Sequence, residues 1–194
     1  MVRVDNRNLK KAVIQSSAFQ KKARRDIELR VARAQQQMLD SFDNHPVTAE
    51  ILDGPDAPNR SGTLGGEGNL FSFIGFESNS SPIGSLRTAL QYVRILRLGT
   101  LGNKALSFRI DLASEGLIRR ATPLPYLRGQ SWAEGIEEGI DNFNSFLAGK
   151  FGRSGGGIQS RSPIRATHFQ PVPYVSQIYQ IFRSALQNAR TPLA

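Results

Sequence analysis

The sequence predicts an α+β fold, in which a small mixed or antiparallel sheet packs with helices and a long N-terminal helix projects from the body. Three observations lead to this prediction. Residues 8–43 contain no Gly or Pro and carry apolar side chains spaced by threes and fours, as in one amphipathic helix. Residues 94–112 alternate apolar and polar side chains around a Gly-containing turn, as in a β-hairpin. Residues 131–148 and 174–189 return to helical spacing.

The composition limits the classes of protein to which the chain can belong. The chain has 194 residues and 39% hydrophobic content, enough to bury a core in one domain. It has no Cys, which excludes disulfides, thiolate nucleophiles and Cys-based zinc sites. The mean hydropathy is -0.32, and neither a long apolar run nor an apolar leader is visible. We therefore expect a soluble protein with no membrane partner.

The net charge of +9 is distributed in blocks of alternating sign. Basic residues exceed acidic ones in three blocks: ten Lys/Arg and five Asp/Glu in residues 1–43, eight and two in 78–130, and six and none in 150–194. Acidic residues exceed basic ones in the two blocks between them: five Asp/Glu and one Lys/Arg in 44–77, and four and none in 131–149. Alternation suits a subunit that binds copies of itself, because a positive patch on one copy then meets a negative patch on the next. Ordinary solvated faces give the same pattern.

The N-terminal helix is longer than a compact body needs. At about 1.5 Å per residue, residues 8–43 would span about 50 Å. We expect residues 1–43 to project as a basic helix, or to break at Gln15-Ser16-Ser17. Basic residues beside its apolar stripe are candidate contacts to DNA or to an acidic partner, with a solvated face as the alternative. They are Lys10, Lys11, Lys21, Lys22, Arg24 and Arg25.

The middle of the chain predicts a flexible loop followed by a buried strand. Pro46 ends the first helix, and a short helical turn over residues 48–52 precedes a Gly- and Pro-rich loop at 53–68. Residues 70–76 place large apolar side chains on both faces of a predicted strand. We expect that strand to be covered on both sides, and the loop to become ordered against a neighbouring subunit.

The following elements are predicted from turn and cap residues. Ser81 and Pro82 begin a helix. It leads into the hairpin, whose strands are predicted at 94–98 and 104–112. The connection at 113–130 is basic and long enough to be a projecting, partner-binding loop, although part of it suits another strand.

The C-terminal third predicts two helices separated by a flexible segment. Ser131 and Glu134 form a capping box that begins a helix running to residue 148. Residues 149–163 are Gly-rich and basic, which is typical of a flexible segment. A short strand at 165–169 and a proline-led helix at 174–189 follow.

Candidate subunit or partner contacts come from the predicted strand and the loops. They are Leu64, Leu70, Phe71, Phe73, Phe76, Arg119, Arg120, Tyr126, Arg128, Arg153 and Arg161. These residues belong to a predicted ring-forming domain at 44–194, with flexible loops at 53–68, 113–130 and 149–163.

No pattern predicts catalysis, a cofactor or a metal. The glycines up to Gly68 lack the Gly-Lys-Ser/Thr of a phosphate loop, and they precede a strand instead of following one. His45 and His168 lack the Gly-x-Ser-x-Gly context of a hydrolase, which remains the third and weakest hypothesis. Glu134, with Glu137, Glu138 and Asp141, forms a carboxylate cluster on the outer side of its helix.

A DNA-binding function is the main alternative because the sequence pI is about 10.5. The sequence has no helix-turn-helix spacing, zinc ligands or aromatic sheet signature. Binding would therefore be nonspecific and directed at phosphates through the basic N-terminal helix.

Several phrases resemble those of tailed-bacteriophage virion proteins, in particular the neck and tail-completion group of head–tail connectors and tail terminators. The resemblance also covers the long charged first helix, the Ser61-Gly62-Thr63-Leu64 turn and the hairpin. The phrases are His45-Pro46-Val47-Thr48, Gly68-Asn69-Leu70-Phe71-Ser72-Phe73-Ile74-Gly75-Phe76, Ser131-Trp132-Ala133-Glu134-Gly135-Ile136-Glu137 and His168-Phe169-Gln170-Pro171-Val172-Pro173-Tyr174. The connection at 113–130 and the helix at 131–148 depart from that group.

The resemblance implies a non-enzymatic structural protein that closes into a six-fold or twelve-fold ring around the DNA channel. Its partners would be further copies of itself, the portal or connector, tail-tube or tail-sheath proteins, and the DNA passing through. Its location would be the head–tail junction of the virion, after synthesis in the host cytoplasm.

Overall fold

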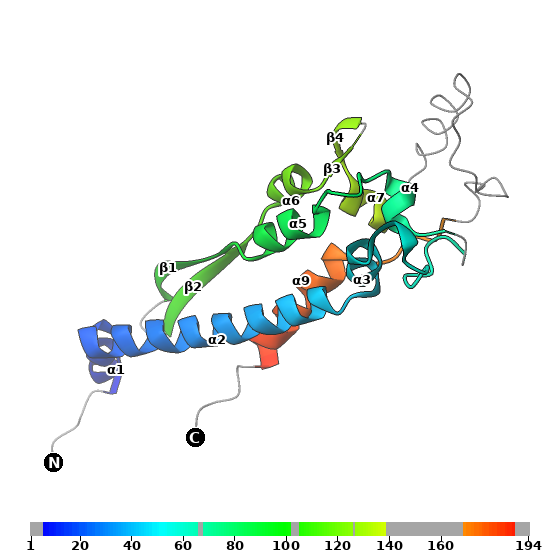
Figure 1. Ribbon diagram of the computed structural model, residues 1–194. Coiled ribbons are helices and arrows are strands. Elements are labelled where there is room, and N and C mark those ends of the chain that lie inside the picture. Colours follow the sequence, from blue (N-terminus) through cyan, green and yellow to red (C-terminus); the bar gives the residue numbers. More distant parts are fainter. Residues whose placement is uncertain (1–5, 66–67, 102–104, 126, 139–168, 189–194) are drawn as a thin grey trace, which may run out of the picture.

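The protein has an α+β fold, seen in a computed structural model that describes residues 6–65, 68–101, 105–125, 127–138 and 169–188. The molecule is elongated (Figure 1). The long helix α2 runs along one side, and the hairpin of strands β1 and β2 lies over its N-terminal half. The shorter helices gather around its C-terminal end.

The predicted break in the N-terminal helix is confirmed. Helix α1 spans Asn6–Gln15 and helix α2 spans Ser17–Asp43. Ser16 between them has an extended backbone, and its Oγ accepts a hydrogen bond from Phe19 N at 3.3 Å. A side-chain acceptor there satisfies a free amide of the new helix, so the chain restarts instead of continuing.

Only the N-terminal half of α2 projects. The apolar residues of its C-terminal half are buried in the core: Val31, Ala34, Met38, Leu39 and Phe42. Residues 34–43 therefore belong to the body, and Val31 packs the preceding turn against it, whereas α1 and most of residues 17–33 extend beyond it. We call α1 together with residues 17–33 the arm.

The run predicted as a strand at 70–76 is a helix, so this prediction is wrong. Helix α4 spans Leu70–Ile74. Asn69 Oδ1 accepts a hydrogen bond from Ser72 N at 2.9 Å, which caps the helix start, and Gly75 ends it with φ of 80°. The expected burial does hold, but it comes from the chain's own core.

The described part of the Gly- and Pro-rich loop, residues 53–65, is held to the body by hydrogen bonds that the sequence did not predict. It follows helix α3 (Pro46–Leu52) and begins with a short 3-10 helix, η1 (Gly54–Asp56). The fully buried Glu50 on α3 holds it: Glu50 Oε2 accepts from Ser61 N at 2.8 Å, and Oε1 accepts from Asn59 Nδ2 at 3.1 Å. Glu50 Oε1 also accepts from Leu70 N at 2.7 Å. One side chain therefore fixes both the loop and the start of α4 within the same chain.

The hairpin is confirmed. Helix α5 spans Pro82–Leu90 with Ser81 as its N-cap residue. Strands β1 (Val93–Leu101) and β2 (Ala105–Leu112) then pair antiparallel, with Ile95 opposite Ile110 and a bulge between Arg97 and Gly99. The alternation of apolar and polar residues determines this register. A shift by one residue would turn the apolar side chains away from the helices on which they pack.

The connection at 113–130 is largely regular structure, contrary to the predicted projecting loop. Helix α6 spans Glu115–Ala121, and strands β3 (Pro123–Leu124) and β4 (Leu127–Ser131) form a second small antiparallel pair. Ser114 Oγ caps α6 by accepting from Leu117 N at 3.3 Å. A seven-residue helix has too few turns to show a clear helical period of apolar residues, so the sequence pattern did not predict α6.

Two C-terminal helices complete the core. Helix α7 spans Trp132–Glu138 and helix α9 spans Val175–Asn188. Trp132, fully buried, lies edge-on to Phe76 at 5.7 Å between ring centroids and 6.2 Å from Tyr174. The rest of the helix predicted to end at 148, the segment at 149–163 and most of the strand predicted at 165–169 lie outside the described residues.

His45 makes the core sensitive to pH. It is the N-cap residue of α3, accepts from Val47 N at 3.3 Å through Nδ1, and packs against Tyr174. Burial lowers the pKa of His45 below 6.5, although its hydrogen bonds to the Gln177 side chain and the Pro173 backbone oppose this shift. The unfolded chain therefore binds the proton more readily, and protonation favours unfolding.

We expect the contribution of His45 to the free energy of unfolding to be constant above pH 6.5. Below pH 6.5 this contribution should decrease as the pH falls, by at most about 1.4 kcal/mol per pH unit. Urea unfolding at pH 7.5 and 5.5 measures this difference. His45→Asn keeps the capping acceptor but removes the titration. An equal pH dependence in the wild type and this variant would show that His45 is not responsible.

Candidate interaction surfaces

An acidic groove lies where α6, α7 and α9 meet, and we call it the body groove. Its volume is about 280 Å³. Its floor is apolar, formed by Ile118, Ala133, Val175 and Tyr179, and acidic side chains surround it. The carboxylates are Glu115, Glu134, Glu137 and Glu138, and among the described residues Arg119 is the one cation that lines it.

Two of these carboxylates share the arginine. Arg119 Nη2 lies 2.6 Å from Glu134 Oε1 and 3.6 Å from Glu115 Oε1. Its hydrogen bond to Glu134 is the main cause of its raised pKa. Four carboxylates against one guanidinium leave the groove with an excess of negative charge, which favours a cationic partner.

The remaining polar groups of the groove mainly position the helices. Glu137 Oε1 accepts from Tyr174 N at 3.0 Å and from Ser176 N at 2.6 Å, so it caps the start of α9. Tyr179 Oη donates to Ala113 O at 2.9 Å, and burial raises the pKa of this phenol to about 12. The tyrosine therefore stays neutral at physiological pH and contributes its ring to the apolar floor.

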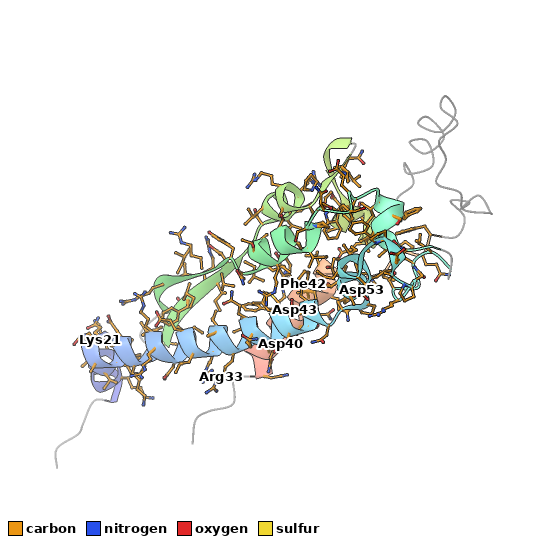
Figure 2. The ribbon with its side chains drawn as sticks, in the orientation of Figure 1. Lys21, Arg33, Asp40, Phe42, Asp43 and Asp53 are labelled. Atoms are coloured by element: carbon orange, nitrogen blue, oxygen red, sulfur yellow. The ribbon has the colours of Figure 1, made fainter. Side chains whose placement is uncertain are left out.

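A second surface follows the outward side of the arm. Phe19, Lys22, Arg25, Leu29 and Arg33 are exposed and recur at spacings of three and four, so they share one side of α2. We call them the arm strip. Arg33 lies on the side of α2 opposite the hairpin (Figure 2). The strip carries three positive charges, and Asp26 beside it carries one negative charge.

Large apolar side chains on the arm are unusually exposed. Leu29 exposes 51% of its surface and Val13 exposes 47%, although both lie among basic residues. Leu98 on the hairpin exposes 62%. Single exposed apolar residues are common, so the combination of Leu29 with Phe19 on one side of α2 is the feature that suits a partner.

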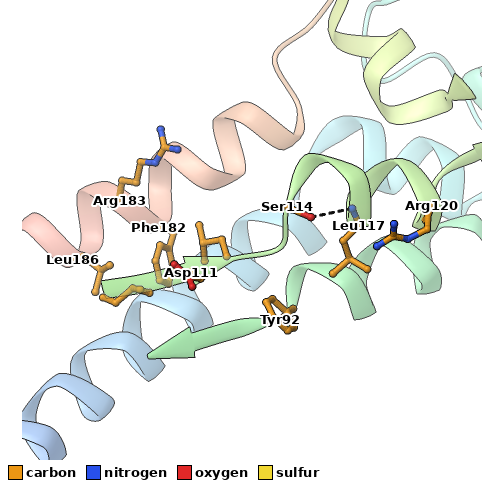
Figure 3. Close-up of a pocket in the computed structure, with 10 residues that line it drawn as sticks. Tyr92, Asp111, Ser114, Leu117, Arg120, Phe182, Arg183 and Leu186 are labelled. Carbon is orange, nitrogen blue, oxygen red and sulfur yellow. Dashed lines mark hydrogen bonds between the residues drawn. The ribbon is translucent and has the colours of Figure 1, made fainter. Parts of the chain in front are cut away.

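Two further grooves border the hairpin. An open groove of about 760 Å³ separates β2 from α6 and α9, with Phe182 and Leu186 facing the strand and Arg120 on α6 (Figure 3). A smaller one, about 250 Å³, lies between the hairpin and the first turns of α2. Arg97 Nη1 bridges it by donating to Gln20 Oε1 at 2.9 Å.

The basic residues predicted to contact DNA or an acidic partner are all exposed on the arm. Lys10 and Lys11 lie on α1. Lys21 and Arg24 line the small groove beside the hairpin, and Arg24 pairs with Glu28 at 2.8 Å. Helix geometry places Lys22 and Arg25 on the outward side instead.

The predicted apolar contacts are mostly used within the chain. Leu64, Leu70 and Phe71 are buried in the core. Phe73 stacks on Phe169 at 5.7 Å, and Phe76 packs against Phe71 and Trp132, so both aromatic residues are half-buried. We therefore do not retain these residues as partner contacts.

The predicted basic loop contacts are divided between elements. Arg119 belongs to the body groove, and Arg120 lines the large groove beside β2. Arg128 lies in β4. Tyr126, Arg153 and Arg161 lie outside the described residues.

The structure adds residues that the sequence reasoning did not assign a role. Glu115 was not considered, and Glu134 and Glu138 were interpreted as an ordinary exposed cluster. Glu50 was missed too, although it follows Val47 by three residues and therefore lies on the same face of α3 as a buried apolar side chain.

The described residues do not gather metal ligands. Within them, no cluster of three or more His, Asp or Glu side chains is placed to hold a metal ion. Ser131, which lines the body groove, shares a hydrogen bond of 2.6 Å with Thr122 Oγ1. His45 lies in the core against Tyr174, and His168 lies outside the described residues.

No known family model, curated protein or solved structure matches the chain. Within the described residues, no helix is long and apolar enough to cross a lipid bilayer.

Proposed function

We propose that the chain is a structural subunit of the neck of a tailed bacteriophage. In this proposal it closes into a cyclic ring at the head–tail junction of the virion, where it joins the portal or connector to the tail or terminates the tail tube. It acts without catalysis. Its partners are further copies of itself, the portal or connector, tail-tube or tail-sheath proteins, and the DNA in the channel.

The observation that carries the proposal is the arm. Its outward side combines Leu29 and Phe19 with basic residues, and its apolar area is not covered by the described residues of the chain. A monomer gains nothing from exposing such a surface, whereas an assembly subunit buries it against its neighbour. The sequence resemblance to neck and tail-completion proteins supports the same function.

Native mass spectrometry of the purified protein tests the proposal. We expect a discrete closed oligomer, of six or twelve copies, either alone or after mixing with the portal and tail-tube proteins encoded in the same genome. Negative-stain images should show rings. A protein that stays monomeric both alone and with those partners would contradict the proposal.

Nonspecific DNA binding is the second candidate, favoured by seven exposed basic residues on the described part of the arm. It predicts duplex binding that weakens steeply with salt, because each phosphate contact releases a counterion. Fluorescence anisotropy with a labelled duplex at 50 and 200 mM salt measures this. An absence of binding at the lower salt concentration would exclude it.

A further inference from the structure

We infer that the arm strip of one copy docks in the body groove of a second copy, which makes the assembly head-to-tail. This inference rests on the proposed function and specifies the contact from which the ring is built. It identifies the occupant of the groove as a second copy of this chain, presenting a basic, partly apolar helix face.

The first argument is charge complementarity. The strip presents Lys22, Arg25 and Arg33, and the described lining of the groove presents four carboxylates and one cation, Arg119. Opposite potentials on two surfaces of one chain favour contact between copies and set its register. Two arms are therefore disfavoured as partners, because their like charges would meet.

The second argument is that both surfaces are partly apolar. The groove floor of Ile118, Val175 and Tyr179 is suited to receive the exposed Leu29 and Phe19. DNA phosphates would pair with the lysines and arginines but would leave these two apolar side chains in water. A protein partner with an acidic rim and an apolar floor covers both kinds of group.

The third argument is placement. The strip lies on the arm, whereas the groove lies among the short helices toward the other end of the molecule (Figure 1). One copy cannot fill its own groove with a rigid helix that points away from it. Contact between two different surfaces leaves one of each free after every step, so copies add until the ring closes.

The strip is also long enough for such a contact. From Phe19 to Arg33 the helix rises by about 21 Å, at about 1.5 Å per residue. Stable interfaces bury about 800 Å² per partner, so the strip would form the centre of the interface and neighbouring surfaces its rim.

Charge reversal and rescue test this docking. The arm variant is Lys22→Glu with Arg25→Glu, and the groove variant is Glu115→Lys with Glu138→Lys; all four side chains are exposed. We expect each variant to raise the dissociation constant of assembly at least about a hundredfold, because like charges then meet across the interface. The variant that carries all four substitutions restores opposite charges and should assemble within about tenfold of the wild type.

The matched control is Lys10→Glu with Lys11→Glu on α1, which makes the same charge change outside the strip. It should assemble like the wild type. A second variant, Leu29→Ala, keeps every charge and should weaken assembly about tenfold, while leaving any duplex DNA binding unchanged. Native mass spectrometry and sedimentation velocity at 150 mM salt give the readout, with circular dichroism to show that each variant is folded.

The outcomes separate this inference from the proposed function. If the wild type forms a ring and both reversals also do, the docking is wrong and the ring proposal stands. If each reversal dissociates the ring but the variant with all four substitutions does not restore it, the two surfaces do not contact each other. If the wild type never assembles, alone or with neck and tail proteins, both proposals are wrong.

Discussion

Replacing Glu50 by Ala should lower the free energy of unfolding by about 4 kcal/mol, because it leaves buried hydrogen-bond donors without an acceptor. Glu50 is fully buried and accepts from Ser61 N, Asn59 Nδ2 and Leu70 N. Both backbone amides lose the carboxylate oxygen to which they donate. The loop at 53–65 and the start of α4 should therefore loosen together.

Urea unfolding followed by the fluorescence of the single Trp measures the effect, since Trp132 is buried in the core. Limited proteolysis should show faster cleavage within residues 53–65. Glu50→Gln should cost less than Glu50→Ala, because one oxygen remains to accept while the new amide faces a donor. The exposed Glu77→Ala is the matched control, and an equal loss in both alanine variants would disprove the role given to Glu50.

Replacing Trp132 by Ala should have an effect of similar size, about 3–5 kcal/mol, because it opens a large cavity at the centre of the core. Its ring contacts Phe76 edge-on and lies near Tyr174, so two aromatic side chains lose a packing partner together. The helices that form the body groove, α7 and α9, are held by the same cluster. We therefore expect this variant to weaken assembly as well as stability.

Thermal unfolding followed by circular dichroism is the appropriate measurement, because the substitution removes the fluorescent probe. Trp132→Phe keeps a ring in the cavity and should recover a large part of the loss. Tyr92→Ala, at a position that exposes 46% of its side chain, is the control and should change stability little. A loss below about 1 kcal/mol for Trp132→Ala would show that the core does not depend on this ring.

Local signals predicted the elements that depend on neighbouring residues. A break at Gln15-Ser16-Ser17 was one of two alternatives, and it occurs because the Ser16 side chain caps the new helix and competes with continuation. The hairpin followed from strict alternation on both sides of a Gly-containing turn. Ser81-Pro82 begins a helix as predicted, for the same local reason.

The error at α4 came from composition. Aromatic and apolar residues in Leu70–Ile74 have a preference for strands, but Asn69 and Gly75 are spaced to cap a helix of about one turn. Five residues carry too little periodicity to decide between the two. Burial of this run was nevertheless predictable, because both interpretations place large apolar side chains on every face.

By itself, the sequence determined an α+β fold with a long basic first helix, a β-hairpin and two charge signs kept in separate blocks. Only the tertiary structure decided that the arm begins where α2 leaves the core, and that Glu50 holds the loop. It also brought Glu115 on α6 beside Glu134 and Glu138 on α7 to form the body groove. The physical reason is separation along the chain: a groove is made by side chains from distant elements, and their approach depends on core packing that no local pattern encodes.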